Sequence, residues 1–218
     1  MPNSDSELGK VYLVGAGPGD PGLMTVKGLD CLRNADAVVH DRLASSRLLR
    51  EARQDAKIYD AGKQRGEHRM TQTEINKLLV DLGSAGNNVC RLKGGDPFIF
   101  GRGGEEAIEL TAAGIPWEVV PGISSTIAAP AYAGIPVTQR GISTSVTIVT
   151  GSEDPNKLDS TINWDALARL SGTLVFVMAW KGMKDIVSAL TSRGMSKERS
   201  AALIQWGTTA KQKVVTGP

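Results

Sequence analysis

Short apolar runs rich in β-branched residues alternate with helical patterns over the first 120 residues, and this alternation limits the fold more than any other feature of the chain. Such runs, bounded by turn-forming residues, are typical of short buried strands. They predict five strands, at residues 11–14, 37–39, 57–59, 89–92 and 117–120. Helical patterns lie at residues 25–34, 43–53, 71–85 and 104–113. This order predicts an α/β fold with a mainly parallel sheet and right-handed crossovers.

The helix predicted at 71–85 has the clearest signals. Thr71 and Glu74 have the spacing of a capping box. The apolar residues after them recur at i, i+3, i+4 and i+7, on one face of a helix: Ile75, Leu78, Leu79 and Leu82. Glu105 and Glu106 fall in the first turn of the helix predicted at 104–113, where carboxylates suit the helix dipole.

The pattern changes after residue 121. An alanine-rich stretch with two prolines, 124–137, leads to strand-like runs at 145–149, 174–177 and 201–204 and to helical patterns near 164–170 and 183–192. We therefore expect two domains, an N-terminal α/β domain at 9–121 and a smaller α/β domain at 122–218.

Glycine is concentrated where a ligand site is expected. The chain has 25 glycines in 218 residues, above the usual share of about 7%. Open parallel sheets bind ligands outside the carboxyl ends of their strands. Twelve of the 25 glycines lie in the five loops that follow the predicted strands of the first domain: Gly15, Gly17, Gly19, Gly22, Gly62, Gly66, Gly94, Gly95, Gly101, Gly103, Gly104 and Gly122.

The first of these loops spells a dinucleotide fingerprint, G-x-G-x-x-G, at residues 17–22, with Asp41 about 20 residues further on. Pro18 and Pro21 argue against this interpretation, because each removes a backbone N–H that a pyrophosphate would need. The helical pattern also starts only near Thr25, after the third glycine. No Walker A loop is present, since no glycine-rich stretch ends in Gly-Lys-Ser/Thr.

The loop at 93–104 combines five glycines with Phe98, Ile99 and Phe100, so backbone and apolar surface could both approach a ligand. Asp96, in the same loop, could accept hydrogen bonds from a ribose or an ammonium group. An Ω-like loop packed on the second domain is the alternative. Residues 61–102 hold seven Lys/Arg and four Asp/Glu. This basic segment suits a ligand with several carboxylates, or forms a solvated face.

Composition narrows the class of protein. Neither the apolar runs nor the N-terminus has the features of a membrane span or a secretory signal. The net charge of +2 gives no argument for nucleic acid. Two cysteines, Cys31 and Cys90, and two histidines without metal-ligand spacing predict reduced thiols, a cytoplasmic protein and no metal site.

Several segments together resemble a known family. V-G-A-G-P-G-D-P-G-L-M-T-V-K-G (14–28) and V-C-R-L-K-G-G-D-P-F-I-F-G-R-G-G-E-E (89–106) are similar to the hallmark segments of tetrapyrrole methylases. H-D-R-L (40–43), G-K-Q-R-G (62–66), V-P-G-I-S-S (120–125), G-I-P-V-T-Q-R (134–140), F-V-M (176–178) and Q-W-G-T-T (205–209) narrow the resemblance to uroporphyrinogen-III C-methyltransferases across nearly all of 9–217.

The resemblance implies a fold of two α/β domains with a ligand cleft between them, and a homodimer. It implies methylation of uroporphyrinogen III at C-2 and C-7, with S-adenosylmethionine as methyl donor, to give precorrin-2. Asp41 matches the proton acceptor and Lys63 the proton donor. The donor site would comprise Pro18, Gly94, Gly95, Asp96, Ile99, Ser124, Ser125, Met178 and Gly207. Basic residues on the predicted rim, Arg42, Arg65, Lys93 and Arg102, would bind the substrate carboxylates.

The chain departs from the family pattern in three ways. Ser124 and Ser125 replace a common Thr-Ala pair, and Gln139 replaces a histidine. Relatives also continue past the position of Pro218 through a helix and a strand, so we expect an apparently truncated second domain with an exposed sheet edge. Two alternatives stay open: a methyltransferase that acts on a later precorrin, and a homologue that binds ligand without turnover.

Overall fold

The computed structural model describes residues 7–62, 70–153 and 161–218. The chain forms two compact units, Met1–Ser124 and Ser125–Pro218. The sequence pattern suggested a boundary after residue 121. The two units are described separately below.

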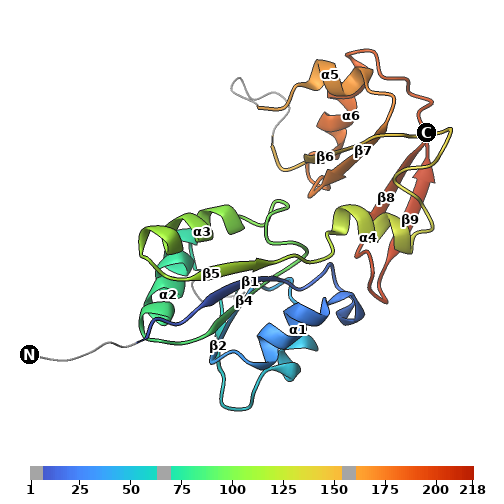
Figure 1. Cartoon of the computed structure of the whole chain (residues 1–218). Coiled ribbons are helices and arrows are strands. Elements are labelled where there is room, and N and C mark those ends of the chain that lie inside the picture. The colour runs from blue at the N-terminus through green and yellow to red at the C-terminus, as the bar shows by residue number, and fades with distance from the viewer. Residues whose placement is uncertain (1–6, 63–69, 154–160) are drawn as a thin grey trace, which may run out of the picture. The chain divides into compact units, whose positions relative to one another are not determined.

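The first unit is built on five parallel strands (Figure 1). They are β1 (Val11–Gly15), β2 (Ala37–His40), β3 (Lys57–Asp60), β4 (Val89–Lys93) and β5 (Trp117–Val120), in the order β3-β2-β4-β1-β5. The connection after β1 leads toward β2 and β3, whereas the connection after β4 leads to β5. The chain therefore changes direction between β1 and β4, which are neighbours, and a ligand crevice is expected at their carboxyl ends.

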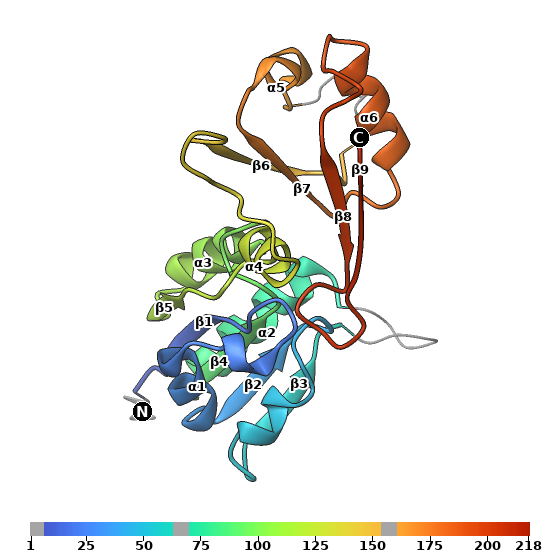
Figure 2. The same ribbon diagram turned by 90° about the vertical axis from the view of Figure 1, so that its right-hand side faces the viewer.

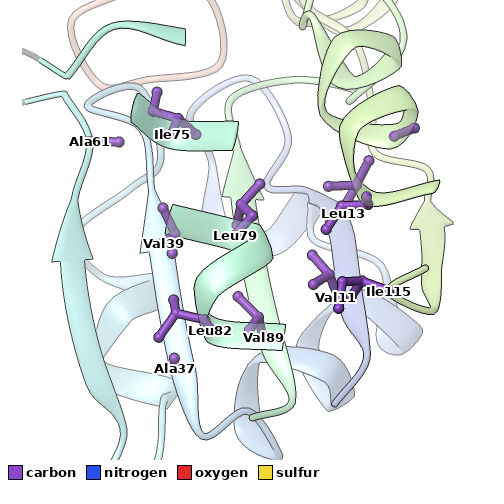
Figure 3. Packing of buried hydrophobic residues seen from close by; sticks show 12 residues of the cluster. Val11, Leu13, Ala37, Val39, Ala61, Ile75, Leu79, Leu82, Val89 and Ile115 are labelled. Carbon is purple, nitrogen blue, oxygen red and sulfur yellow. The ribbon is translucent and has the colours of Figure 1, made fainter. Parts of the chain in front are cut away.

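Helices cover both faces of this sheet. α2 (Gln72–Ser84) and α3 (Gly103–Ala112) pack on one face, where Leu79 and Leu110 are fully buried against Val11, Val39 and Val89. Figure 3 shows this layer, with Ile75, Leu79 and Leu82 of α2 lying over side chains of β1, β2 and β4. Full burial of a leucine side chain is worth about 1.5–3 kcal/mol, so this layer is a main source of stability.

α1 (Val26–Arg33) and a 3-10 turn, Leu48–Glu51, pack on the opposite face. Leu32 and Leu48 contribute to a second buried cluster with Val38, Cys90 and Leu92. Side chains of successive strand residues point to opposite faces. β4 therefore sends Cys90 and Leu92 to the α1 layer and leaves its other residues to the α2–α3 layer.

The second unit contains two separate pairs of strands (Figure 2). β6 (Val146–Thr150) and β7 (Thr173–Val177) are parallel, and α5 (Trp164–Arg169) and α6 (Met183–Thr191) pack with them. Trp164 stacks on Phe176 with ring centroids 6.2 Å apart and an interplanar angle of 2°. β8 (Ala201–Gln205) and β9 (Lys213–Gly217) form an antiparallel hairpin, and α4 (Ser125–Tyr132) opens the unit.

The structure confirms the predicted α/β class, with the mainly parallel sheet in the first unit and smaller sheets in the second. The prediction of a helix at 43–53 was wrong, because only the 3-10 turn Leu48–Glu51 forms there. The hydroxyl of Ser45 accepts a hydrogen bond from Arg47 N at 3.4 Å and its carbonyl accepts one from Leu48 N at 2.9 Å. Serine bonds of this kind compete with a continuous helix.

Among the described residues, no helix is both long and apolar enough to cross a membrane.

Candidate active site at the carboxyl edge of the parallel sheet

The loops that follow β3, β2 and β4 contact one another through two glycines. A Cβ on Gly62, after β3, would lie 2.5 Å from the backbone N of Arg42, which belongs to the loop after β2. A Cβ on Gly94, after β4, would lie 2.6 Å from the Cβ of Leu43 in the same loop. Distances this short exclude a larger residue, so the loops carrying Arg42 and Gly94 are held close together.

The loops after β4, β1 and β5 are equally close. Gly95 N donates to Gly17 O at 2.7 Å and Gly17 N donates to Gly95 O at 3.2 Å. A Cβ on Gly122, after β5, would lie 2.4 Å from Gly95 O and 2.6 Å from Gly15 Cα. Each pair of neighbouring strands thus has its following loops in direct contact. Pro18 stands beside Gly17, at the point where the chain changes direction.

Gly95 has the features of a backbone surface left open for a ligand. Its φ is +69°, and a Cβ built on it would meet nothing within 4 Å. Its backbone is nevertheless fixed by the pair of hydrogen bonds to Gly17. A rigid glycine next to open space lets a ligand approach the main chain closely.

Asp96 organises the loop that follows β4. Its Oδ1 accepts hydrogen bonds from Phe98 N at 2.8 Å and from Ile99 N at 3.2 Å. Its Oδ2 accepts one from Gly122 N at 3.0 Å, which ties this loop to the one after β5. The sequence suggested that Asp96 hydrogen-bonds a ligand; the structure adds three backbone partners that fix its orientation.

The same loop presents apolar side chains on a strained backbone. Phe98, Ile99 and Phe100 are 53%, 43% and 46% exposed. Phe100 and Arg102 have φ values of 53° and 58°, in the left-handed region that residues other than glycine rarely adopt. Exposed apolar side chains and backbone outliers of this kind are common at ligand sites.

Asp41 is held at the end of β2 by the neighbouring strand β4. Its backbone N donates to Leu92 O at 3.1 Å. Its Oδ1 accepts a hydrogen bond from Arg91 Nη2 at 2.6 Å. The Arg91 side chain is 2% exposed, whereas that of Asp41 is 33% exposed. Asp41 is therefore a fixed carboxylate that can still reach a ligand.

Asp41 is the partly exposed member of an ion cluster that is otherwise buried. We call the four residues Asp41, Arg91, Lys93 and Glu106 the buried ion cluster. Glu106, on α3, is 0% exposed, and its Oε1 lies 2.9 Å from Arg91 Nε and 2.8 Å from Lys93 Nζ. Burial and the nearby Arg91 guanidinium lower the pKa of Lys93. Burial acts in the same direction on Arg91, but the charges of Glu106 and Asp41 outweigh it and raise the pKa of Arg91.

The basic residues expected on the rim occupy different environments. Arg42 is exposed. Arg102 is exposed too, and its Nε and Nη2 donate to the two oxygens of Glu105 at 2.8 and 2.7 Å. Lys93 differs from the expectation, because its side chain is buried at 2% exposure with Glu106. Lys63 and Arg65 lie outside the described residues.

The remaining residues predicted for the donor site belong to the loop after β5 and to the second unit. Ser124 is half-buried, and Ser125 is the exposed first residue of α4. Met178 follows β7 with a φ of 60° and is 59% exposed. A Cβ on Gly207, after β8, would lie 2.5 Å from the Cβ of Ala129 on α4.

Sequence reasoning missed Trp206, which precedes Gly207. It has a φ of 55° and is 60% exposed, a combination similar to that of Met178. The sequence signals were its place in the Q-W-G-T-T segment and its position two residues after the strand-like run at 201–204.

In the part of the chain that the structure describes, no group of three or more His, Cys, Asp or Glu side chains is placed to hold a metal ion. Cys31 is half-buried and Cys90 is buried, and both are free thiols. Burial raises the pKa of each thiol.

Comparison with protein families and curated proteins identifies clear relatives. Residues 10–218 match the family model of tetrapyrrole (corrin/porphyrin) methylases. A uroporphyrinogen-III C-methyltransferase of Synechocystis sp. is 51% identical, and the match covers 96% of this chain and 80% of that protein. An S-adenosyl-L-methionine-dependent uroporphyrinogen III methyltransferase of Methanosarcina barkeri is 47% identical, over 96% and 82% of the two chains. A siroheme synthase of Pseudomonas aeruginosa is 51% identical, but only 44% of its length is matched.

Solved structures of tetrapyrrole methyltransferases are similar to this chain as well. A uroporphyrin-III C-methyl transferase from Thermus thermophilus, complexed with S-adenyl homocysteine, has a TM-score of 0.81 and 36% identity over 96% of this chain and 88% of that one. A cobalt precorrin-4 methyltransferase has a TM-score of 0.83 and 28% identity, with 100% and 87% covered. With its family model matched from residue 10 to residue 218, the chain belongs to the tetrapyrrole (corrin/porphyrin) methylases.

Proposed function

We propose that the chain is a methyltransferase that transfers methyl groups from S-adenosylmethionine to uroporphyrinogen III, at C-2 and C-7, to give precorrin-2. The observation that carries this proposal is the identity of about half the residues, over 96% of the chain, to relatives that bear this activity in their names. The partly exposed carboxylate of Asp41 at the carboxyl edge of the sheet supports it.

We propose Pro18, Gly94, Gly95, Asp96, Ile99 and Ser124 of the first unit as donor-site residues. The family resemblance is our ground for adding Ser125, Met178 and Gly207. The open space over Gly95 fits this assignment, because no atom within 4 Å of a Cβ built there would keep a ligand from the main chain. Ile99 supplies exposed apolar contact area for the donor, and the Met178 side chain is exposed as well. The three backbone hydrogen bonds to Asp96 keep its carboxylate in one orientation.

The chemistry requires alignment and a base. A carbon–carbon bond forms between the sulfonium methyl and a pyrrole carbon as the carbon–sulfur bond breaks, and its electron pair stays on sulfur as a thioether. The ring then carries the positive charge and must release one net proton. We assign removal of this proton to Asp41. Lys63 would donate a proton at another ring position as a second ring proton leaves, so that each methyl transfer releases one proton overall. A site that holds the reacting atoms in line supplies most of the acceleration, and the proton transfers add to it.

Basic residues would hold the substrate by its carboxylates. We propose Arg42, Arg65 and Arg102 for this role, because a guanidinium pairs well with a carboxylate. Arg102 would exchange its exposed partner Glu105 for the substrate, which costs little because exposed ion pairs are worth only about 0–1 kcal/mol. Lys93 is a poor candidate for direct contact with the substrate, since its amino group is buried. We assign it instead the role of a counter-ion to Glu106 inside the protein.

We further propose that the protein is cytoplasmic and acts as a homodimer. Two free thiols are usual in a reducing compartment. The dimer follows from the family resemblance. Light scattering on the purified chain tests it, with twice the mass of the 23.1 kDa chain expected and the mass of one chain contradicting it.

One incubation tests the proposed reaction. The pure chain is mixed with S-adenosylmethionine and freshly prepared uroporphyrinogen III, and the tetrapyrrole product is weighed by mass spectrometry. We expect a product with two added methyl groups. Binding of both compounds without product would favour a ligand-binding homologue, and failure to bind uroporphyrinogen III would favour a later precorrin as substrate.

A further inference from the structure

Arg91 and Lys93 carry charge into the apolar layer between the sheet and α2–α3. They alternate along β4 with Cys90 and Leu92, which face the opposite layer. Both side chains are 2% exposed. Burial of charge costs several kcal/mol per ion, and apolar residues of similar volume are often as stable or more stable. Stability alone therefore does not explain the buried ion cluster.

Glu106 joins the two cations through a single oxygen. Its Oε1 accepts hydrogen bonds from Arg91 Nε at 2.9 Å, from Lys93 Nζ at 2.8 Å and from Gln72 Nε2 at 3.3 Å. Its Oε2 is buried and has no hydrogen-bond partner within the described ranges. The carboxylate is thus oriented toward β4 and leaves its second oxygen unused.

Arg91 connects the buried carboxylate of Glu106 to the partly exposed carboxylate of Asp41. Its Nε donates to Glu106, its Nη1 to Val39 O at 3.4 Å, and its Nη2 to Asp41 Oδ1 at 2.6 Å. The guanidinium is planar and rigid, so a contact that fixes Nε also fixes the direction of Nη2. The position of the Asp41 carboxylate therefore depends on Glu106, although no direct contact joins them.

We infer that Glu106 is a positioning residue that acts on Asp41 through Arg91, an inference that rests on the proposed proton-acceptor role of Asp41. Lys93 balances the charge of Glu106, so the buried ion cluster has two cations and two anions. Glu106 keeps the base in place while uroporphyrinogen III binds and leaves.

Two double variants separate positioning from charge balance. K93M/E106Q and K93M/E106L each remove one cation and one anion. The glutamine side chain of the first variant would retain an oxygen for Arg91 Nε, whereas the leucine side chain of the second would not. We expect kcat of the leucine variant to be about tenfold or more below that of the glutamine variant, because small misplacements of reacting groups have effects of this size. KM for both substrates and the affinity for S-adenosylhomocysteine should agree between the two variants within about twofold.

Equal kcat values in the two folded variants would overturn the inference, as would a loss that appears in KM and in S-adenosylhomocysteine binding instead of kcat. A second arm needs no turnover. The thermal midpoints of D41N, E106Q and D41N/E106Q are compared with that of the unaltered chain. Non-additive shifts support coupling through Arg91, and additive shifts overturn it. If the unaltered chain forms no methylated product, the proposed function fails and this arm alone decides the inference.

Discussion

Gly122 illustrates how little room the contacting loops leave for side chains at the carboxyl edge of the sheet. Its Cα packs against Gly15, and a Cβ there would lie 2.4 Å from Gly95 O. The obstacle is backbone, which cannot move aside as a flexible side chain would. The loops that we propose to hold the donor are therefore close enough to exclude even a methyl group.

A substitution of Gly122 by alanine should accordingly be costly. We expect G122A to lower the free energy of unfolding by about 1–3 kcal/mol, the usual cost of overpacking, measured by urea denaturation. G104A is the matched control, because a Cβ at Gly104 of α3 would meet nothing within 4 Å. An alanine in that helix should be neutral or stabilising by up to about 1 kcal/mol. Equal destabilisation by both variants would contradict this account.

Glu118 provides a pH-dependent contribution away from the candidate site. Hydrogen bonds from Lys10 and Lys27 lower its pKa from 4.5 to about 2. A carboxylate with a lowered pKa in the folded state stabilises the protein above the pKa of the unfolded state, and the effect is lost as pH falls. We expect the thermal midpoint of E118Q to lie below that of the unaltered chain at pH 7. This difference in midpoint should shrink as pH falls from about 4.5 to 2.

The control for Glu118 is E109Q, which changes an exposed glutamate on α3 that has no ion pair among the residues in the described ranges. Its thermal midpoint should equal that of the unaltered chain at pH 7 and at pH 2. A difference in thermal midpoint between E118Q and the unaltered chain that stays constant down to pH 2, or that widens, would show that the charge of Glu118 does not act through the two lysines.

Lys93 shows why charge counting misplaced part of the site. Its sequence neighbours suggested a basic rim, but the two-residue period of a strand places it on the same face of β4 as Val89, which is fully buried. That period could have been read from the sequence. The partner could not, because Glu106 is brought to β4 only by the packing of α3.

At the scale of elements, α2 is the helix that local sequence determines most fully. Thr71 Oγ1 accepts a hydrogen bond from Glu74 N at 3.2 Å, and Glu74 Oε2 accepts one from Thr71 N at 2.6 Å. The predicted capping box is confirmed. Ile75, Leu79 and Leu82 face the sheet as their spacing predicted.

The loss of this cap should be measurable. We expect T71A to reduce the free energy of unfolding by about 1 kcal/mol, because the backbone N–H of Glu74 in the first turn of α2 loses its acceptor, the Thr71 hydroxyl. T73A, an exposed position inside the same helix, should be neutral or slightly stabilising, since alanine is the better helix former. Identical thermal midpoints for the two variants would contradict a role for the cap.

Elements that depend on tertiary contacts were harder to predict. Within the stretch at 124–137, residues Ser125–Tyr132 form α4 although Pro130 lies inside the helix, and helix propensity alone argues against this. β9 went unpredicted because its side chains are all exposed and no apolar alternation marks it. The five strands of the first unit were predicted within a residue of their ends. β1 and β2 are buried on both faces, which leaves near-continuous apolar runs in the sequence.

Hydrogen exchange should separate these two kinds of element. β1 and β4 lie inside the parallel sheet between two helical layers. Among the described residues, β9 pairs with β8 alone, and it is exposed throughout. We expect the amides of β4 to exchange slowest and those of β9 to exchange many times faster, since opening free energy follows burial. Protection of β9 equal to that of β4 would show that another surface covers the hairpin.

For the whole molecule, the parallel sheet of the first unit explains how residues far apart in sequence form one candidate site. Asp41, Gly95 and Gly122 come from three different loops, and the strand order β3-β2-β4-β1-β5 brings those loops side by side. The sequence could predict that the loops share an edge. The order of the strands, which places Arg91 next to Asp41, is a property of the folded sheet.

The most direct test of the central claim is the mass of the tetrapyrrole formed by the unaltered chain and by D41N from uroporphyrinogen III and S-adenosylmethionine. We predict two added methyl groups with the unaltered chain and a strongly reduced yield with D41N, at equal S-adenosylhomocysteine binding. Unmethylated tetrapyrrole from the unaltered chain would contradict the proposed function. Normal yield from folded D41N would contradict the role of Asp41.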